Sequence, residues 1–123
     1  MVTKAELFLN ILLELERSNP DILTSAIVTL DGLTMASTAK DTPSKDTFAA
    51  YSAAAYKRAD ESMEELSGEK VDILVFGSKN HRVFSIIVGN YALLIALTGK
   101  DGEIGNNISE LRKAAGKIEE LLI

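Results

Sequence analysis

The sequence predicts an α/β (α+β) three-layer sandwich, in which a five-stranded antiparallel sheet carries helices on both faces in the order α-β-β-α-β-β-β-α. Three segments place apolar residues at helical spacing. Short turns containing glycine separate apolar, β-branched runs, as is typical of antiparallel hairpins. The last strands are apolar on both sides, so both faces of the sheet need cover. With 123 residues, we expect a single domain over residues 1–123.

The first helix is expected over residues 4–17. Thr3 and Glu6 form a capping box at its start. Apolar side chains then follow at helical spacing, namely Leu7, Phe8, Ile11, Leu12 and Leu15. Pro20 disfavours the helical conformation at Asn19, which ends the helix.

The stretch "AIVTLDGLTMAS" predicts a β-hairpin, with strands over residues 22–30 and 33–37. Asp31 and Gly32 form the two-residue turn, where glycine supplies the positive φ that such a turn needs. Asp31 could instead act as an acid, a base or a metal ligand. The turn is the better interpretation, because no histidine, cysteine or second carboxylate lies near Asp31 in the sequence.

A second helix follows the loop at residues 39–46, with Thr42 or Ser44 as its N-cap and an end at Ser67-Gly68. On a helical wheel, a stripe about 140° wide is expected to cover one sheet face; it contains Phe48, Tyr51, Ala55, Tyr56, Ala59, Met63 and Leu66. Ala49, Ala50, Ala53 and Ala54 fall outside that stripe. A helix that is apolar nearly all round predicts a symmetric dimer in which two such helices pack. Alternatively, alanine is simply a good helix former on an exposed face.

Three strands are expected over residues 70–77, 81–89 and 91–99, with Gly89-Asn90 as a two-residue turn between the last two. Residues 100–106 are expected to form a loop. Asn107 and Glu110 then resemble the start of a third helix. Its apolar stripe contains Ile108, Leu111, Ala115, Ile118 and Leu122.

Composition excludes several classes of function. The chain has no cysteine and a net charge of −5, which argues against thiolate chemistry and against nucleic-acid partners. Neither a signal peptide nor a membrane-spanning stretch is expected, and a cytoplasmic location fits. The sequence contains no phosphate-binding glycine loop, and His81 is its single histidine. We therefore expect no catalytic residue, no cofactor and no metal site.

Taken in order, these motifs resemble the roadblock/dynein light-chain family over essentially the whole chain. The resemblance is carried by "AIVTLDGLTMAS", the alanine-rich helix, "VFGSKNHRVFSIIVGNYALLIALTGKDGEIG" and "NNISELRKAAGKIEELL". It implies a profilin-like fold and homodimers or heterodimers that pair their central helices and the neighbouring edge strands, here Ala49 to Arg58 and Val71 to Val75. The expected interface residues are Ala49, Ala50, Ala53, Ala54, Lys57, Arg58, Val71, Ile73 and Val75.

The resemblance also implies a function. We expect a non-catalytic dimeric regulator that binds a small Ras-like GTPase and modulates its nucleotide cycle or its positioning. The alternative is a structural adaptor or scaffold subunit of a motor, polarity or sensory complex, without nucleotide dependence. A small-molecule sensor would need a pocket between sheet and helix, and an enzyme is the least favoured class. Arg58 is the one arginine near the expected dimer surface, and no catalytic role is assigned to it.

Overall fold

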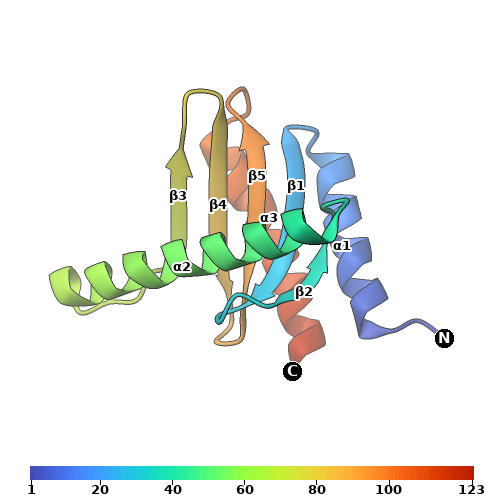
Figure 1. Ribbon diagram of the computed structural model, residues 1–123, viewed down its shortest axis with the longest axis horizontal. Helices are drawn as coiled ribbons and strands as arrows, with labels where there is room; N and C mark the ends of the chain where they lie inside the picture. Colours follow the sequence, from blue (N-terminus) through green and yellow to red (C-terminus); the bar gives the residue numbers. More distant parts are fainter.

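The chain folds into three layers, with α1 and α3 on one face of a sheet and α2 on the other (Figure 1). The computed structural model describes residues 1–123, except the side chain of Thr42. Over the described residues the elements are α1 (Lys4–Ser18), β1 (Ile22–Thr29), β2 (Thr34–Ser37), α2 (Thr42–Ser67), β3 (Ile73–Gly77), β4 (His81–Val88), β5 (Ala92–Gly99) and α3 (Ile104–Leu122).

The sheet has the strand order β2-β1-β5-β4-β3, and each neighbouring pair is antiparallel. The predicted fold class is therefore confirmed, including the order of the elements. β1 and β5 pair through most of their length and form the centre of the sheet, whereas β3 lies at one edge. β2 lies at the other edge, so β2 and β3 are the strands through which another chain can reach the sheet.

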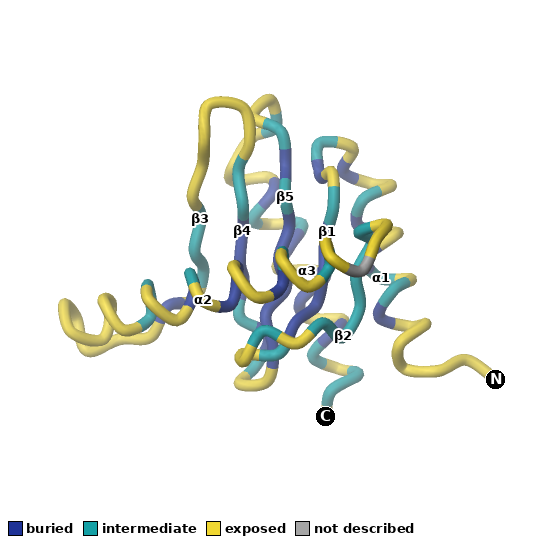
Figure 2. The backbone as a smooth tube through the Cα atoms, in the orientation of Figure 1, coloured by how far each residue is buried: buried dark blue, intermediate teal, exposed yellow. Residues whose placement is uncertain are grey.

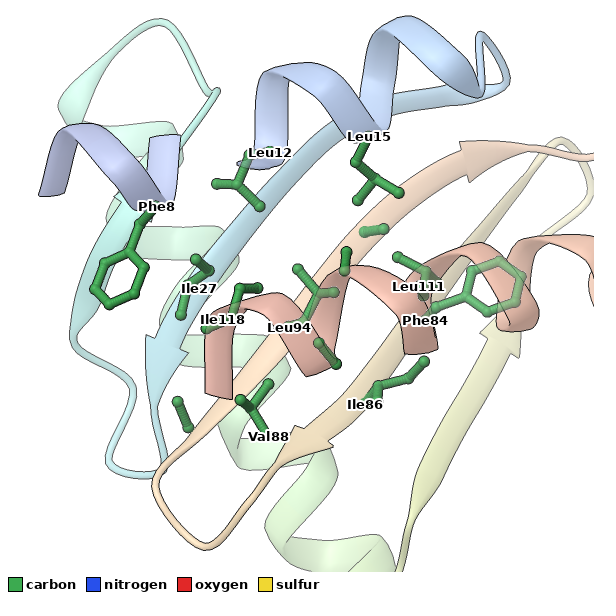
Figure 3. Packing of buried hydrophobic residues seen from close by; sticks show 14 of the residues in the cluster. Phe8, Leu12, Leu15, Ile27, Phe84, Ile86, Val88, Leu94, Leu111 and Ile118 are labelled. Atoms are coloured by element: carbon green, nitrogen blue, oxygen red, sulfur yellow. The ribbon is translucent and has the colours of Figure 1, made fainter. Parts of the chain in front are cut away.

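The larger core lies between the sheet and the helices α1 and α3 (Figure 3). Leu12 from α1 and Leu111 and Ile118 from α3 are fully buried against Phe84 and Leu94 of the sheet. Thr3 caps α1 as predicted, since the Glu6 N–H donates to Thr3 Oγ1 at 3.1 Å, and the Thr3 hydroxyl donates to the Glu6 carboxylate at 3.3 Å. Burial of these large side chains stabilises the face of the sheet opposite α2.

The smaller core lies under α2 and is built from smaller side chains. Ala49, Ala53 and Tyr56 of α2 are buried against a sheet surface that includes Val28 and Leu93. Because alanine has a single methyl group, the helix backbone can approach the sheet and its turns closely. Only the part of the sheet beneath these buried α2 residues is covered on this face, and the rest of the face stays open.

The termini of α2 correct one expectation and confirm another. Asp41 is the N-cap in place of Thr42 or Ser44, because its carboxylate accepts the Ser44 N–H at 2.8 Å. That hydrogen bond holds the pKa of Asp41 below its ordinary value. The sequence offers several good caps in a row here, and only the geometry selects among them. At the other end, Gly68 adopts the expected left-handed conformation with φ 74°.

The turn between β1 and β2 contains three residues, not the two that we expected. The Gly32 N–H donates to Thr29 O at 2.9 Å, and the Thr29 N–H donates to Leu33 O at 2.8 Å. Leu30, Asp31 and Gly32 thus form the loop, and the positive φ (91°) is at Gly32 and not at Asp31. A Cβ at Gly32 would lie 3.3 Å from Ala50 Cα. The turn therefore packs directly on α2, which explains both the glycine and the facing alanines.

Two other boundaries differ from the predictions. Val88 pairs with Ala92, so three residues beginning at Gly89 connect β4 and β5 in place of two. α3 begins at Ile104, three residues before the expected Asn107. Asn107 is fully buried within the helix, so its side chain is not a cap. The capping pattern, a polar residue with glutamate three residues later, also occurs inside helices, so it does not by itself mark where a helix begins.

Replacing Gly32 with alanine is expected to lower the free energy of unfolding by about 1–2 kcal/mol, because the backbone is left-handed and the added Cβ meets α2. Urea denaturation provides the measurement. The matched control is Gly116→Ala in α3, where a Cβ would meet nothing within 4 Å. That substitution should raise stability by about 0.5–1 kcal/mol through helix propensity. Equal effects of the two substitutions would contradict the close packing of the turn on α2.

Candidate functional site

An apolar groove of about 630 Å³ lies beside the first half of α2, on the face of the sheet that this helix covers only in part. Its floor is a single row across β3, β4 and β5, because Phe76 pairs with Val83 and Val83 pairs with Leu97. We call this the sheet groove. All its lining residues are uncharged: Thr24, Ala39, Pro43, Ser44, Thr47, Phe48, Tyr51, Ser52, Phe76, Val83 and Leu97.

The side of α2 that faces the sheet differs from the predicted stripe. Ala49, Ser52, Ala53 and Tyr56 are the buried positions. Three large members of the predicted stripe are instead exposed, with exposed fractions of 74% for Tyr51, 41% for Met63 and 85% for Leu66. The wheel alone could not show this, because the close approach of Gly32 and the sheet selects the side with small residues. Much of the apolar stripe is left without cover inside the chain.

The expected interface residues on α2 therefore divide into two groups. Ala49 and Ala53 are buried within the chain and cannot contact a partner directly, which corrects that part of the prediction. Ala50, Ala54, Lys57 and Arg58 are exposed. We call these four residues the outer face of α2.

Val71 is also wrongly placed by the prediction, because it precedes β3 and does not lie on it. Its N–H donates to Asp60 Oδ1 at 2.8 Å, and its carbonyl accepts the Tyr56 hydroxyl at 2.7 Å. Both backbone groups are therefore used within the chain. Burial raises the pKa of Tyr56, and the negative charges of Asp60 and Asp72 raise it further. These contacts fix the segment between α2 and the edge strand.

Ile73 and Val75 lie on the edge strand, as the prediction requires. The Ile87 N–H donates to Asp72 O at 3.2 Å, and the Ser78 N–H donates to His81 O at 2.8 Å, so even-numbered positions turn their backbone toward β4. Ile73, Val75 and Gly77 consequently turn theirs to the open side. Over the described residues β3 pairs with β4 alone, which leaves a short row of donors and acceptors free for another strand.

Beyond β3, α2 continues past the edge of the sheet (Figures 1 and 2). Residues 61–70 are all exposed. Sequence reasoning missed the floor of the sheet groove, Phe76, Val83 and Leu97. The sequence did contain a signal for this groove. These strands are apolar on both sides, and α2 is the one helix expected to cover the face opposite α1 and α3.

His81 and Arg58, the two side chains considered above for a chemical role, are both exposed, and Arg58 forms an ion pair with Glu61 at 3.5 Å. Among the described residues, no set of three histidine, aspartate or glutamate side chains is placed to hold a metal ion. Within the same residues, we also find no helix with the length and apolar character needed to cross a membrane.

Comparison with known proteins places this geometry among related folds. The family model described as "Roadblock/LC7 domain" matches residues 8–98. A Roadblock/LC7 domain from Streptomyces avermitilis superposes with a TM-score of 0.88 at 18% identity, covering 93% of this chain and 96% of that one. The gliding protein MglB from Thermus thermophilus gives 0.84 at 18% identity, covering 98% and 92%.

A further structure, "MglB with tetrameric arrangement", gives a TM-score of 0.87 at 17% identity, covering 98% of this chain and 91% of that one. No curated protein matches the sequence significantly. At these identities the structural likeness establishes the fold.

Tyr56→Phe is expected to cost about 1 kcal/mol of stability at neutral pH, because the hydrogen bond to Val71 O is lost. The variant should also change the response to alkali. Since the folded-state pKa of Tyr56 is raised, its contribution is intact below the ordinary value near 10 and is lost as pH rises toward the raised pKa. Tyr56→Phe should therefore flatten the alkaline loss of stability, measured by urea denaturation across pH. Tyr51→Phe, at an exposed tyrosine, is the control and should leave the profile unchanged.

Proposed function

Because the chain belongs to the Roadblock/LC7 domain family, we propose that it is a non-catalytic, self-associating regulator of a small Ras-like GTPase, formed by one domain over residues 1–123. The observation that carries the proposal is the surface around α2, where an apolar sheet groove, an exposed apolar side of the helix and an open edge strand adjoin. Surfaces of this kind mark protein interaction sites.

The nature of that surface supports a binding role over an enzymatic one. The groove is lined by apolar and hydroxyl side chains and contains no titratable pair that could transfer a proton. The carboxylate of Asp60 in α2 has a structural role, because it accepts the Val71 N–H and forms an ion pair with Lys70. The chain therefore acts by contact with other proteins, and a cytoplasmic location suits such partners.

The GTPase partner follows from the family, because bacterial and archaeal relatives commonly act with small Ras-like GTPases. Two relatives named above are MglB proteins, and one of them is described in a tetrameric arrangement, which supports self-association here. On this chain we assign the partner contact to the outer face of α2. Ala50 and Ala54 allow close approach, and Lys57 and Arg58 provide charge at its border.

The test is capture of a Ras-like GTPase from native lysate with the tagged chain, in the presence of a GTP analogue or of GDP. We expect recovery in one nucleotide state to exceed recovery in the other by at least about fivefold, a difference of roughly 1 kcal/mol in binding, and we expect no GTP hydrolysis by the isolated chain. A nucleotide-insensitive assembly without a GTPase would favour the structural adaptor and overturn the proposal.

Substitution on the outer face refines this test. Ala54→Glu places a charge where a close contact is proposed and should reduce capture of the GTPase by about tenfold or more, with the fold intact by circular dichroism. The matched control is Ala5→Glu, an identical change at an exposed position of α1. An equal loss of capture in both variants would contradict the assignment to the outer face.

A further inference from the structure

We propose that Asp21 and Asn107 bind a buried water molecule, which joins the start of β1 to the start of α3. Asp21 lies in the connection between α1 and β1, and Asn107 lies near the beginning of α3. The loop between β5 and α3 passes between them. This site is independent of the surface around α2 and of the function proposed above.

The side chain of Asn107 is the observation that points to a ligand. It is fully buried, and over the described residues neither its amide nitrogen nor its amide oxygen has a hydrogen-bond partner. Buried polar atoms in proteins are nearly always hydrogen-bonded, because an unpaired one gives up its contacts with solvent and gains nothing in return. A small ligand that accepts a hydrogen bond from the amide nitrogen would remove part of this cost.

Asp21 supplies the second half of the site. Its Oδ2 atom is also buried and has no hydrogen-bond partner in the part of the chain that the structure describes. A Cβ at Gly102 would overlap this oxygen and would lie 3.3 Å from Asn107 Nδ2. The carboxylate and the amide therefore border the same point beside Gly102. A water with hydrogen bonds of about 2.9 Å joins atoms up to roughly 5.8 Å apart, which covers their separation.

Backbone hydrogen bonds hold the loop over the carboxylate. The Gly99 N–H donates to Asp21 O at 3.1 Å, which ties the end of β5 to the start of β1. Arg82 Nη1 donates to Gly102 O at 2.7 Å and fixes the loop from the side of β4. Because any side chain at position 102 would overlap the Asp21 carboxylate, glycine is required there. The two unpaired side chains are thus kept beside one another.

The charges around the site favour a neutral ligand over a cation. α3 begins without a side-chain cap, so its free N–H groups place positive partial charge near the Asp21 carboxylate. The guanidinium of Arg82, bound to Gly102 O, adds a full positive charge close by. A calcium ion takes about six to eight oxygen ligands, whereas a buried water makes about two to four hydrogen bonds. Water therefore fits the few polar atoms that remain.

A high-resolution crystal structure of the unmodified chain tests the inference without any variant. We expect a density peak about 2.7–3.2 Å from both Asp21 Oδ2 and an amide atom of Asn107. Oxygen-17 magnetic relaxation dispersion counts long-lived buried waters in solution. Asn107→Leu should lose the contribution of one such water. The matched control is Asn106→Leu, the same change at the neighbouring exposed asparagine, which should leave the signal unchanged.

Each outcome supports or overturns the water site. A peak at hydrogen-bonding distance from both side chains, together with a selective loss of signal in Asn107→Leu, would support it. A direct hydrogen bond between Asn107 Nδ2 and Asp21 Oδ2, with no peak between them, would overturn it. A peak about 2.3–2.6 Å from several oxygens would identify a cation and would equally overturn it. If Asn107→Leu does not fold, the crystal structure of the unmodified chain still decides.

Discussion

The close contact between α2 and the hairpin turn at Gly32 determines how this face of the protein is organised. The turn can touch the helix only because Gly32 has no side chain and Ala49, Ala50 and Ala53 have short ones. That contact selects the sheet-facing side of α2 and thereby leaves Phe48 and Tyr51 to line the sheet groove. The uncovered surface is thus a consequence of how tightly another part of the same helix is packed.

The general architecture could be predicted from the sequence because its signals are local. Local patterns define each element without reference to distant residues. Examples are the capping pattern at Thr3 and Glu6, Gly68 at the end of α2, and the apolar strand sequences between glycine-containing turns. The order of elements and the antiparallel hairpins then restrict the sheet to few arrangements. The predicted boundaries failed where several candidates competed, as at Asp41, or where a capping pattern lay inside a helix, as at Asn107.

The interaction surface was harder to predict, for a physical reason. A helical wheel ranks sides by hydrophobicity, and it expects the most apolar side to face the core. In α2 the side with small residues is buried while Met63 and Leu66 remain exposed. Ile73 and Val75 were placed correctly on the edge strand. Val71 was not, because its backbone is engaged by side chains of α2, a contact that no local pattern reveals.

The uncovered sheet groove also has a thermodynamic consequence. Apolar surface that is in water in the single chain and removed from water in a pair makes association part of the folding equilibrium. In the self-association proposed above, the population of folded chain rises with its total concentration through mass action, and dilution weakens the fold as well as the complex. A cell that lowers the amount of such a protein would lose its activity more steeply than in proportion to the number of molecules removed.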